Sequence, residues 1–76
     1  MKSVNICLDS IDKVKGLVNV VSSLEGDFDL VSDRYVVDAK SIMGIFSLDL
    51  SKHLRLDIHN EDAAEKVISL IKAYIV

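Results

Sequence analysis

The sequence predicts an α+β fold, an open-faced sandwich in which helices cover one face of an antiparallel sheet. Four short segments alternate apolar and polar residues, which is the two-residue period of half-buried strands. Two longer segments repeat apolar residues at helical spacing, and a short apolar run lies between them. Strands with a single apolar face need helices on that face only. The element order β-α-β-β-α-β-α also fits a ferredoxin-like split βαβ unit.

Length and composition restrict the class of protein. We expect one domain over residues 1–76, since 50% of the residues are hydrophobic and no linker-like segment interrupts the chain. Cys7 is the single cysteine, so an internal disulfide is impossible and a cytoplasmic location is expected. The net charge of -3 disfavours nucleic acid as a partner. No apolar run approaches the roughly 20 residues of a membrane helix, and no signal peptide is apparent.

The first half of the chain predicts a strand followed by a long helix. Val4, Ile6 and Leu8 alternate with polar residues, and Asp9 or Ser10 can cap the helix that follows. This helix should span residues 11–24, and its buried stripe comprises Ile11, Val14, Leu17, Val18, Val21 and Leu24. Gly26 lies where a left-handed residue would end the helix, and Gly16 within it indicates close packing.

The remaining strands and the last helix have equally clear patterns. Residues 27–31 and 35–38 predict a hairpin joined by the turn sequence at residues 32–34. Residues 54–58 show the most regular alternation in the chain. Asn60 can cap a final helix, whose apolar stripe runs to the C-terminus through Ala64, Val67, Ile68, Ile71 and Ile75.

The stretch between the third and fourth strands is the best candidate for function. Ser41 reads as the N-cap of a short helix over residues 41–48, which has five large apolar residues in its last seven positions. A short helix cannot bury all of them, so some of Ile42, Met43, Ile45 and Phe46 should form an exposed partner site. A phosphate on Ser41 would place about two negative charges beside that site with little change of fold.

Catalysis finds little support in the sequence. No glycine-rich loop, zinc-ligand cluster or Ser/His/Asp arrangement is present, so we expect no enzyme activity, cofactor or metal. The carboxylates of Asp27, Asp29 and Asp57 fall on polar strand faces and are expected to be solvated. His53 and His59 have no partner in sequence and are expected at the surface. Cys7 has no neighbouring cation to lower its pKa and should be inert.

One stretch resembles a known family. The second-helix signature of HPr, the phosphocarrier of the bacterial sugar phosphotransferase system, is similar to Asp38-Ala39-Lys40-Ser41-Ile42-Met43-Gly44-Ile45-Phe46-Ser47-Leu48. The resemblance implies a four-stranded antiparallel sheet of order 1-4-2-3. It also implies that Ser41 is a regulatory serine phosphorylated by a dedicated kinase. Ile42, Met43 and Phe46 would then dock Enzyme I and transcriptional regulators.

The carrier motif of that family is missing. Between the first strand and the first helix the family has a Gly-Leu-His-Ala-Arg-Pro-like segment, whereas residues 8–15 here contain no histidine, arginine or proline. Asp9 and Asp12 would also repel a phosphate. We therefore expect the turn to be closed, without a phosphate-shaped cavity. A branch of the family that lacks the histidine but keeps the serine is the best parallel.

The sequence thus leaves three hypotheses. The first is an HPr-like regulatory or protein-interaction module that acts through the Ser41 helix and not as a histidine phosphocarrier. The second is a phosphoryl carrier that uses a non-standard residue, His53 or His59. The third is a degenerate domain whose apolar patch only forms a homodimer. The expected oligomeric state is a monomer or a weak homodimer.

Overall fold

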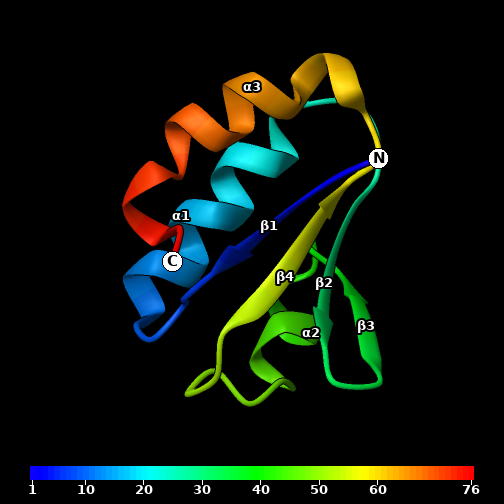
Figure 1. Ribbon diagram of the computed structural model, residues 1–76. Helices are drawn as coiled ribbons and strands as arrows, with labels where there is room; N and C mark the ends of the chain where they lie inside the picture. The colour runs from blue at the N-terminus through cyan, green and yellow to red at the C-terminus, as the bar shows by residue number, and fades with distance from the viewer.

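The computed structural model describes residues 1–76 and has the predicted order of elements. The elements are β1 (Lys2–Ile6), α1 (Ile11–Ser22), β2 (Phe28–Ser32), β3 (Tyr35–Asp38), α2 (Ile42–Phe46), β4 (Leu54–Ile58), α3 (Glu61–Leu70) and a 3-10 turn (Lys72–Tyr74). The four strands form one antiparallel sheet in the order β1-β4-β2-β3 (Figure 1). The predicted α+β sandwich and its strand order are confirmed.

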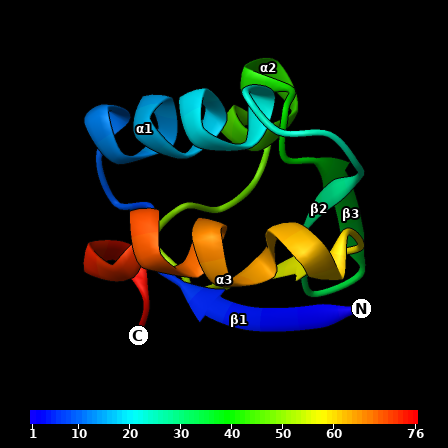
Figure 2. The ribbon, with the colours of Figure 1, turned by 90° about the horizontal axis from the view of Figure 1, so that it is seen from above.

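The helices lie together on one face of the sheet, with α1 beside α3 and α2 beside α1 (Figure 2). The apolar sides of the strands and helices meet in one cluster of 17 buried residues. None of the helices has the length and apolar character needed to cross a membrane. Phe28, Leu30 and Leu56 are among the largest fully buried side chains of this cluster. The core therefore follows from the alternation of the strands, as the sequence indicates.

The opposite face of the sheet holds polar residues, and one of them is not solvated. In the central strand β4, Asp57 lies between Ser3 of β1 and Asp29 of β2. Asp57 is only 6% exposed, so the expectation of a solvated carboxylate was wrong. Neighbours on both sides of a central strand cover its short side chains, and the adjacent Arg55 covers this one as well.

Helix α1 begins as predicted but ends earlier. Ser10 caps it by accepting a hydrogen bond from the Lys13 amide, and Ser22 is the last helical residue, two before the predicted end. Gly26 has the expected positive φ, 103°, but it lies beyond the C-cap Ser23 and so does not end the helix as predicted. A Cβ added at Gly16 would overlap the Tyr74 hydroxyl, which explains this glycine by close packing.

The last helix does not reach the C-terminus. Helix α3 ends at Leu70 and a 3-10 turn reverses the chain, although apolar residues continue at helical spacing. The C-terminal segment, residues 74–76, then lies against β1: the Cys7 amide donates to the Tyr74 carbonyl and the Val76 amide donates to the Asn5 carbonyl. Ile75 forms an isolated bridge with Ile6. These bonds cover one end of the free edge of β1.

Candidate docking site

The site centres on Ser41, the N-cap of α2. Its backbone is extended, and its hydroxyl accepts a hydrogen bond from the Gly44 amide at 3.1 Å. The predicted cap is confirmed, but the helix has only five residues and ends at Phe46, short of the predicted Leu48. The Ser41 side chain is exposed, so its oxygen is reachable from solvent.

The apolar residues of α2 divide between core and surface. Ile45 and Leu48 are buried, Ile42 is half-buried, and Met43 and Phe46 are 78% and 42% exposed. Residues three apart share a side of a helix, which explains why Met43 and Phe46 face out together. We call Ile42, Met43 and Phe46 the α2 patch. Two of its three side chains are well exposed, as the density of apolar residues in this stretch predicts.

Gly44 permits the close approach of the cap to the helix. A Cβ at this position would lie 3.2 Å from the Ser41 hydroxyl oxygen and 3.4 Å from the Val37 Cβ atom. The first separation is tighter than an ordinary van der Waals contact, and the second is at the lower end of the ordinary range. The glycine in the middle of the apolar run therefore keeps space open between Ser41, β3 and the first turn of α2.

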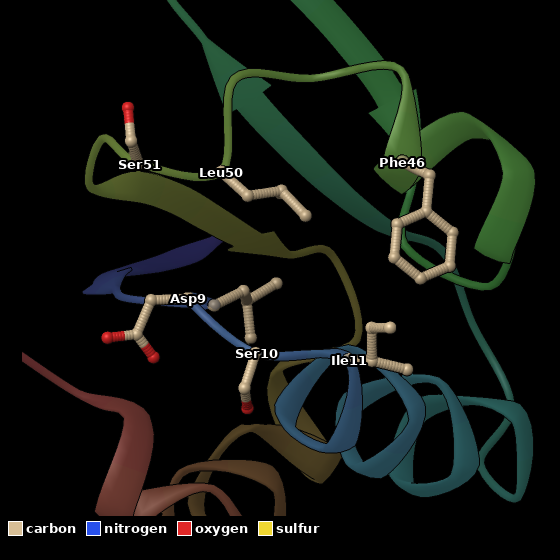
Figure 3. Close-up of a pocket in the computed structure, with 7 residues that line it drawn as sticks. Asp9, Ser10, Ile11, Phe46, Leu50 and Ser51 are labelled. Atoms are coloured by element: carbon tan, nitrogen blue, oxygen red, sulfur yellow. The ribbon is translucent and has the colours of Figure 1, made fainter.

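A hollow of about 350 Å³ lies between the start of α1 and the loop after α2 (Figure 3). It is lined by Leu8, Asp9, Ser10, Ile11, Phe46, Leu50 and Ser51. The expectation of a closed turn without a cavity was therefore wrong in part, although the lining is mainly apolar. Phe46 and Leu50 approach from one side and Ile11 from the other, so the α2 patch continues into the hollow (Figure 3).

Two lining residues were not identified from the sequence. Ile11 was assigned to the buried stripe of its helix but is 61% exposed. Ile11 is the first residue of the helix, and the buried side chains of the helix begin one turn later, at Val14. Leu50 lies in an irregular connector, where spacing says nothing about burial. An apolar residue at the open end of a helix was the signal that could have indicated Ile11.

The rim of the hollow carries an ion pair between Asp9 and Lys13. Asp9 lies 3.0 Å from the Lys13 ammonium, and the hydrogen bond and attraction of that cation hold the pKa of the Asp9 carboxyl below its usual value. The same hydrogen bond raises the pKa of Lys13. The Ser10 hydroxyl already accepts from the Lys13 amide. Because Asp9 pairs with the Lys13 ammonium, no cation at this rim is left to bind a phosphate. The hollow therefore suits an apolar ligand better than a phosphate.

The structure does not bring the two histidines together. His53 is exposed before β4 and His59 follows that strand, so roughly 20 Å of extended chain separates them. The Nε2 atom of His59 lies 2.8 Å from the Asp29 carboxylate, a partner that the sequence did not indicate. The strand pairing places Asp29 near the end of β4 and so explains the contact.

Asp57 belongs to a polar cluster on the other face of the sheet. Arg55 donates from Nε and Nη2 to the two carboxylate oxygens at 2.8 and 3.1 Å, and the Ser3 hydroxyl donates at 2.7 Å. Burial raises the pKa of Asp57, but these hydrogen bonds outweigh it and hold the pKa below the ordinary value. Because every oxygen has a donor, the cluster acts as a structural clamp between β1 and β4.

Comparisons with known proteins agree with this architecture. No protein-family model matches the sequence, and no match was found among curated proteins. Among solved structures, the chain is similar to HPr-C-His from Thermoanaerobacter tengcongensis, with a TM-score of 0.78 and 28% identity over 96% of this chain and 89% of that one. The phosphocarrier protein HPr from Bacillus anthracis shares the fold, with a TM-score of 0.71 and 24% identity over 99% and 94% of the two chains. By strand order and near-complete coverage of both chains, this chain has the HPr-like fold.

Proposed function

We propose that this protein is a regulatory interaction module related to the phosphotransferase system, which docks protein partners through the α2 patch. Ser41 acts as the switch, and the protein is neither an enzyme nor a histidine phosphocarrier. The observation that carries the proposal is the position of the Ser41 hydroxyl, which is exposed and caps the helix that presents Met43 and Phe46. Phosphotransferase-system proteins, transcriptional regulators and a serine kinase are the partners that this site suits.

The switch works by charge at short range. Phosphorylation of Ser41 adds about two negative charges within one helical turn of Met43. The phosphate oxygens can accept from the first-turn amides in place of the hydroxyl, so the fold changes little. A partner that buries Met43 and Phe46 would then have to desolvate that charge, which weakens binding unless the partner offers a cation. The effect should decrease at high salt.

Capture experiments test this role of Ser41. Immobilised wild type, Ser41→Asp and Met43→Lys are exposed to the same lysate, with Ser69→Asp on the exposed side of α3 as the matched control. We expect the set of captured proteins to change with Ser41→Asp and Met43→Lys and to stay the same with Ser69→Asp. Identical sets for wild type and both α2 variants would show that Ser41 is only a cap.

A second function, phosphoryl transfer through His59, is favoured by one contact. Asp29 at 2.8 Å can orient the imidazole for attack on a phosphoryl donor. The surroundings oppose this role, since Asp29, Glu61 and Asp62 are all acidic and would repel the transferred group. Incubation with Enzyme I and phosphoenolpyruvate, followed by mass spectrometry, decides between the two functions. We expect no acid-labile phosphate, and its appearance on His59 or His53 would overturn the regulatory reading.

A further inference from the structure

Strand β3 has a free edge that presents apolar side chains. It pairs with β2 on one side only, and Tyr35 and Val36 are 65% and 62% exposed. A free edge offers unpaired backbone donors and acceptors to another strand. Proteins commonly protect such edges with lysine, but Lys40 bonds the Leu24 carbonyl and lies over the Phe28 ring, away from this edge. The edge is therefore open to strand addition.

The ladder shows which backbone groups of β3 point outward. The Ala39 amide donates to the Phe28 carbonyl across the β2–β3 pair at 2.7 Å. Because hydrogen-bonded positions alternate in an antiparallel pair, Val37 and Tyr35 also direct their backbone groups toward β2. The amide and carbonyl of Val36 then point away from the sheet. Val36 is thus the centre of the unpaired edge.

The side chains around Val36 form a self-complementary pattern. Val36 and Asp38 occupy alternate positions of β3 and so share the open face of the sheet. Arg34 is an exposed turn residue directly before the strand, so the order along the chain is positive, apolar, negative. In an antiparallel pair of two copies centred on Val36, each Arg34 lies opposite the partner copy's Asp38. The chain's ion pairs join other residues, so both charges remain available for such a contact.

Symmetry leaves few alternatives to this register. Directly opposed residues of an antiparallel pair have their side chains on the same face of the sheet. A two-fold axis perpendicular to the sheet must therefore lie midway between one residue and the same residue of the second copy. An axis at Tyr35 would set Arg34 against Val36, and an axis at Val37 would set Val36 against Asp38. The axis at Val36 is the one that pairs opposite charges twice and apolar side chains once.

We propose that a second copy of this chain adds to β3 by antiparallel pairing centred on Val36, which gives a symmetric dimer with one continuous eight-stranded sheet. Val36 exchanges two backbone hydrogen bonds with its counterpart, and two Arg34–Asp38 pairs flank them. Strand β3 has only four residues, so the contact is small and the dissociation constant should lie between about 0.1 and 1 mM. This association uses a different surface from the α2 patch.

A charge-swap experiment tests the proposal by analytical ultracentrifugation of the full chain up to about 1 mM, where a contact of this size is populated. Arg34→Asp and Asp38→Arg should each raise the dissociation constant at least about tenfold, since like charges then oppose one another. An equimolar mixture of the two variants should restore association, because the introduced aspartate of one variant then lies opposite the introduced arginine of the other. A monomeric wild type at the highest concentration, or a mixture no better than its parents, would overturn the proposal.

Further variants separate this edge from other surfaces and from misfolding. Met43→Lys should leave association unchanged, and its loss there would assign the contact to the α2 patch instead. Val36→Lys sets two cations face to face on the axis and should abolish the dimer, whereas Tyr35→Lys, at an equally exposed site, should weaken it less.

Asp38 also accepts from the Lys40 amide, so Asp38→Asn serves as a milder variant if Asp38→Arg unfolds. The Val36 amide should exchange with solvent more slowly as concentration rises, and concentration-independent exchange would contradict the model.

Discussion

The hydroxyl of Ser41 contributes to stability as well as to regulation. Ser41→Ala removes the acceptor for the Gly44 amide and should lower the free energy of unfolding by about 1 kcal/mol. Ser41→Asp keeps an acceptor at the helix start and should cost less. Urea denaturation of the three proteins measures both effects. An alanine variant as stable as wild type would mean that water replaces the cap without cost.

The Asp57 clamp should make stability depend on pH in the acid range. Its folded pKa lies below the unfolded value of about 3.9, so the stabilisation is complete above that value and is lost as pH falls through the folded pKa. Asp57→Asn should cost about 2 kcal/mol at neutral pH, and the difference from wild type should shrink as the acid range is entered. Urea unfolding across this range measures it, with the exposed Asp27→Asn as control. A difference that is constant with pH would exclude the carboxylate as its source.

Single residues also show what sequence alone can and cannot predict. The Ser41 cap depends on a serine just ahead of an apolar run, which is local information and was predicted. The burial of Asp57 depends on Ser3, which is 54 residues away, and on Arg55 folding across it. Ile11 has the right spacing for the core but stands at the uncovered end of its helix. Long-range register and helix placement decide such cases, and a single sequence does not contain them.

At the scale of elements, neighbouring residues of α2 have different roles: Ile45 belongs to the core and Phe46 to the exposed patch. Ile45→Ala should destabilise the protein by about 3 kcal/mol because Ile45 is fully buried. Phe46→Ala should cost only about 1 kcal/mol, since its side chain is 42% exposed in the folded protein. Denaturant unfolding and partner capture on the same variants would separate the two roles. A large loss of stability with Phe46→Ala would mean that the ring is part of the core.

The elements themselves were predictable where periodicity is strong. The alternation over residues 54–58 and the stripe of α1 gave the right types and nearly the right positions. The ends were less certain, because apolar residues continue past Leu70 while the chain turns back to meet β1. The hollow between α1 and the loop after α2 arises from the placement of two elements, so no local pattern predicts it.

For the whole molecule, the C-terminal segment should contribute strongly to stability. Ending the chain at Ala73 removes the backbone bonds to Cys7 and Asn5 and takes Tyr74 and Ile75 from their packing against α1 and β1. The expected loss is about 3 kcal/mol, which is a large share of the stability of a small domain. Thermal unfolding measures it, with deletion of Val76 alone as the milder comparison. Unchanged unfolding of the truncated chain would contradict this role.

The C-terminal segment has a further consequence for assembly. A fibre grows only if each subunit offers two edges, one to receive a strand and one to extend it. Here residues 74–76 occupy part of the β1 edge, so growth from that side is obstructed. Contact through β3 uses the same edge on both copies and closes after two subunits. Residues 74–76, which fold back over one end of β1, therefore oppose growth of the proposed pair into a longer assembly.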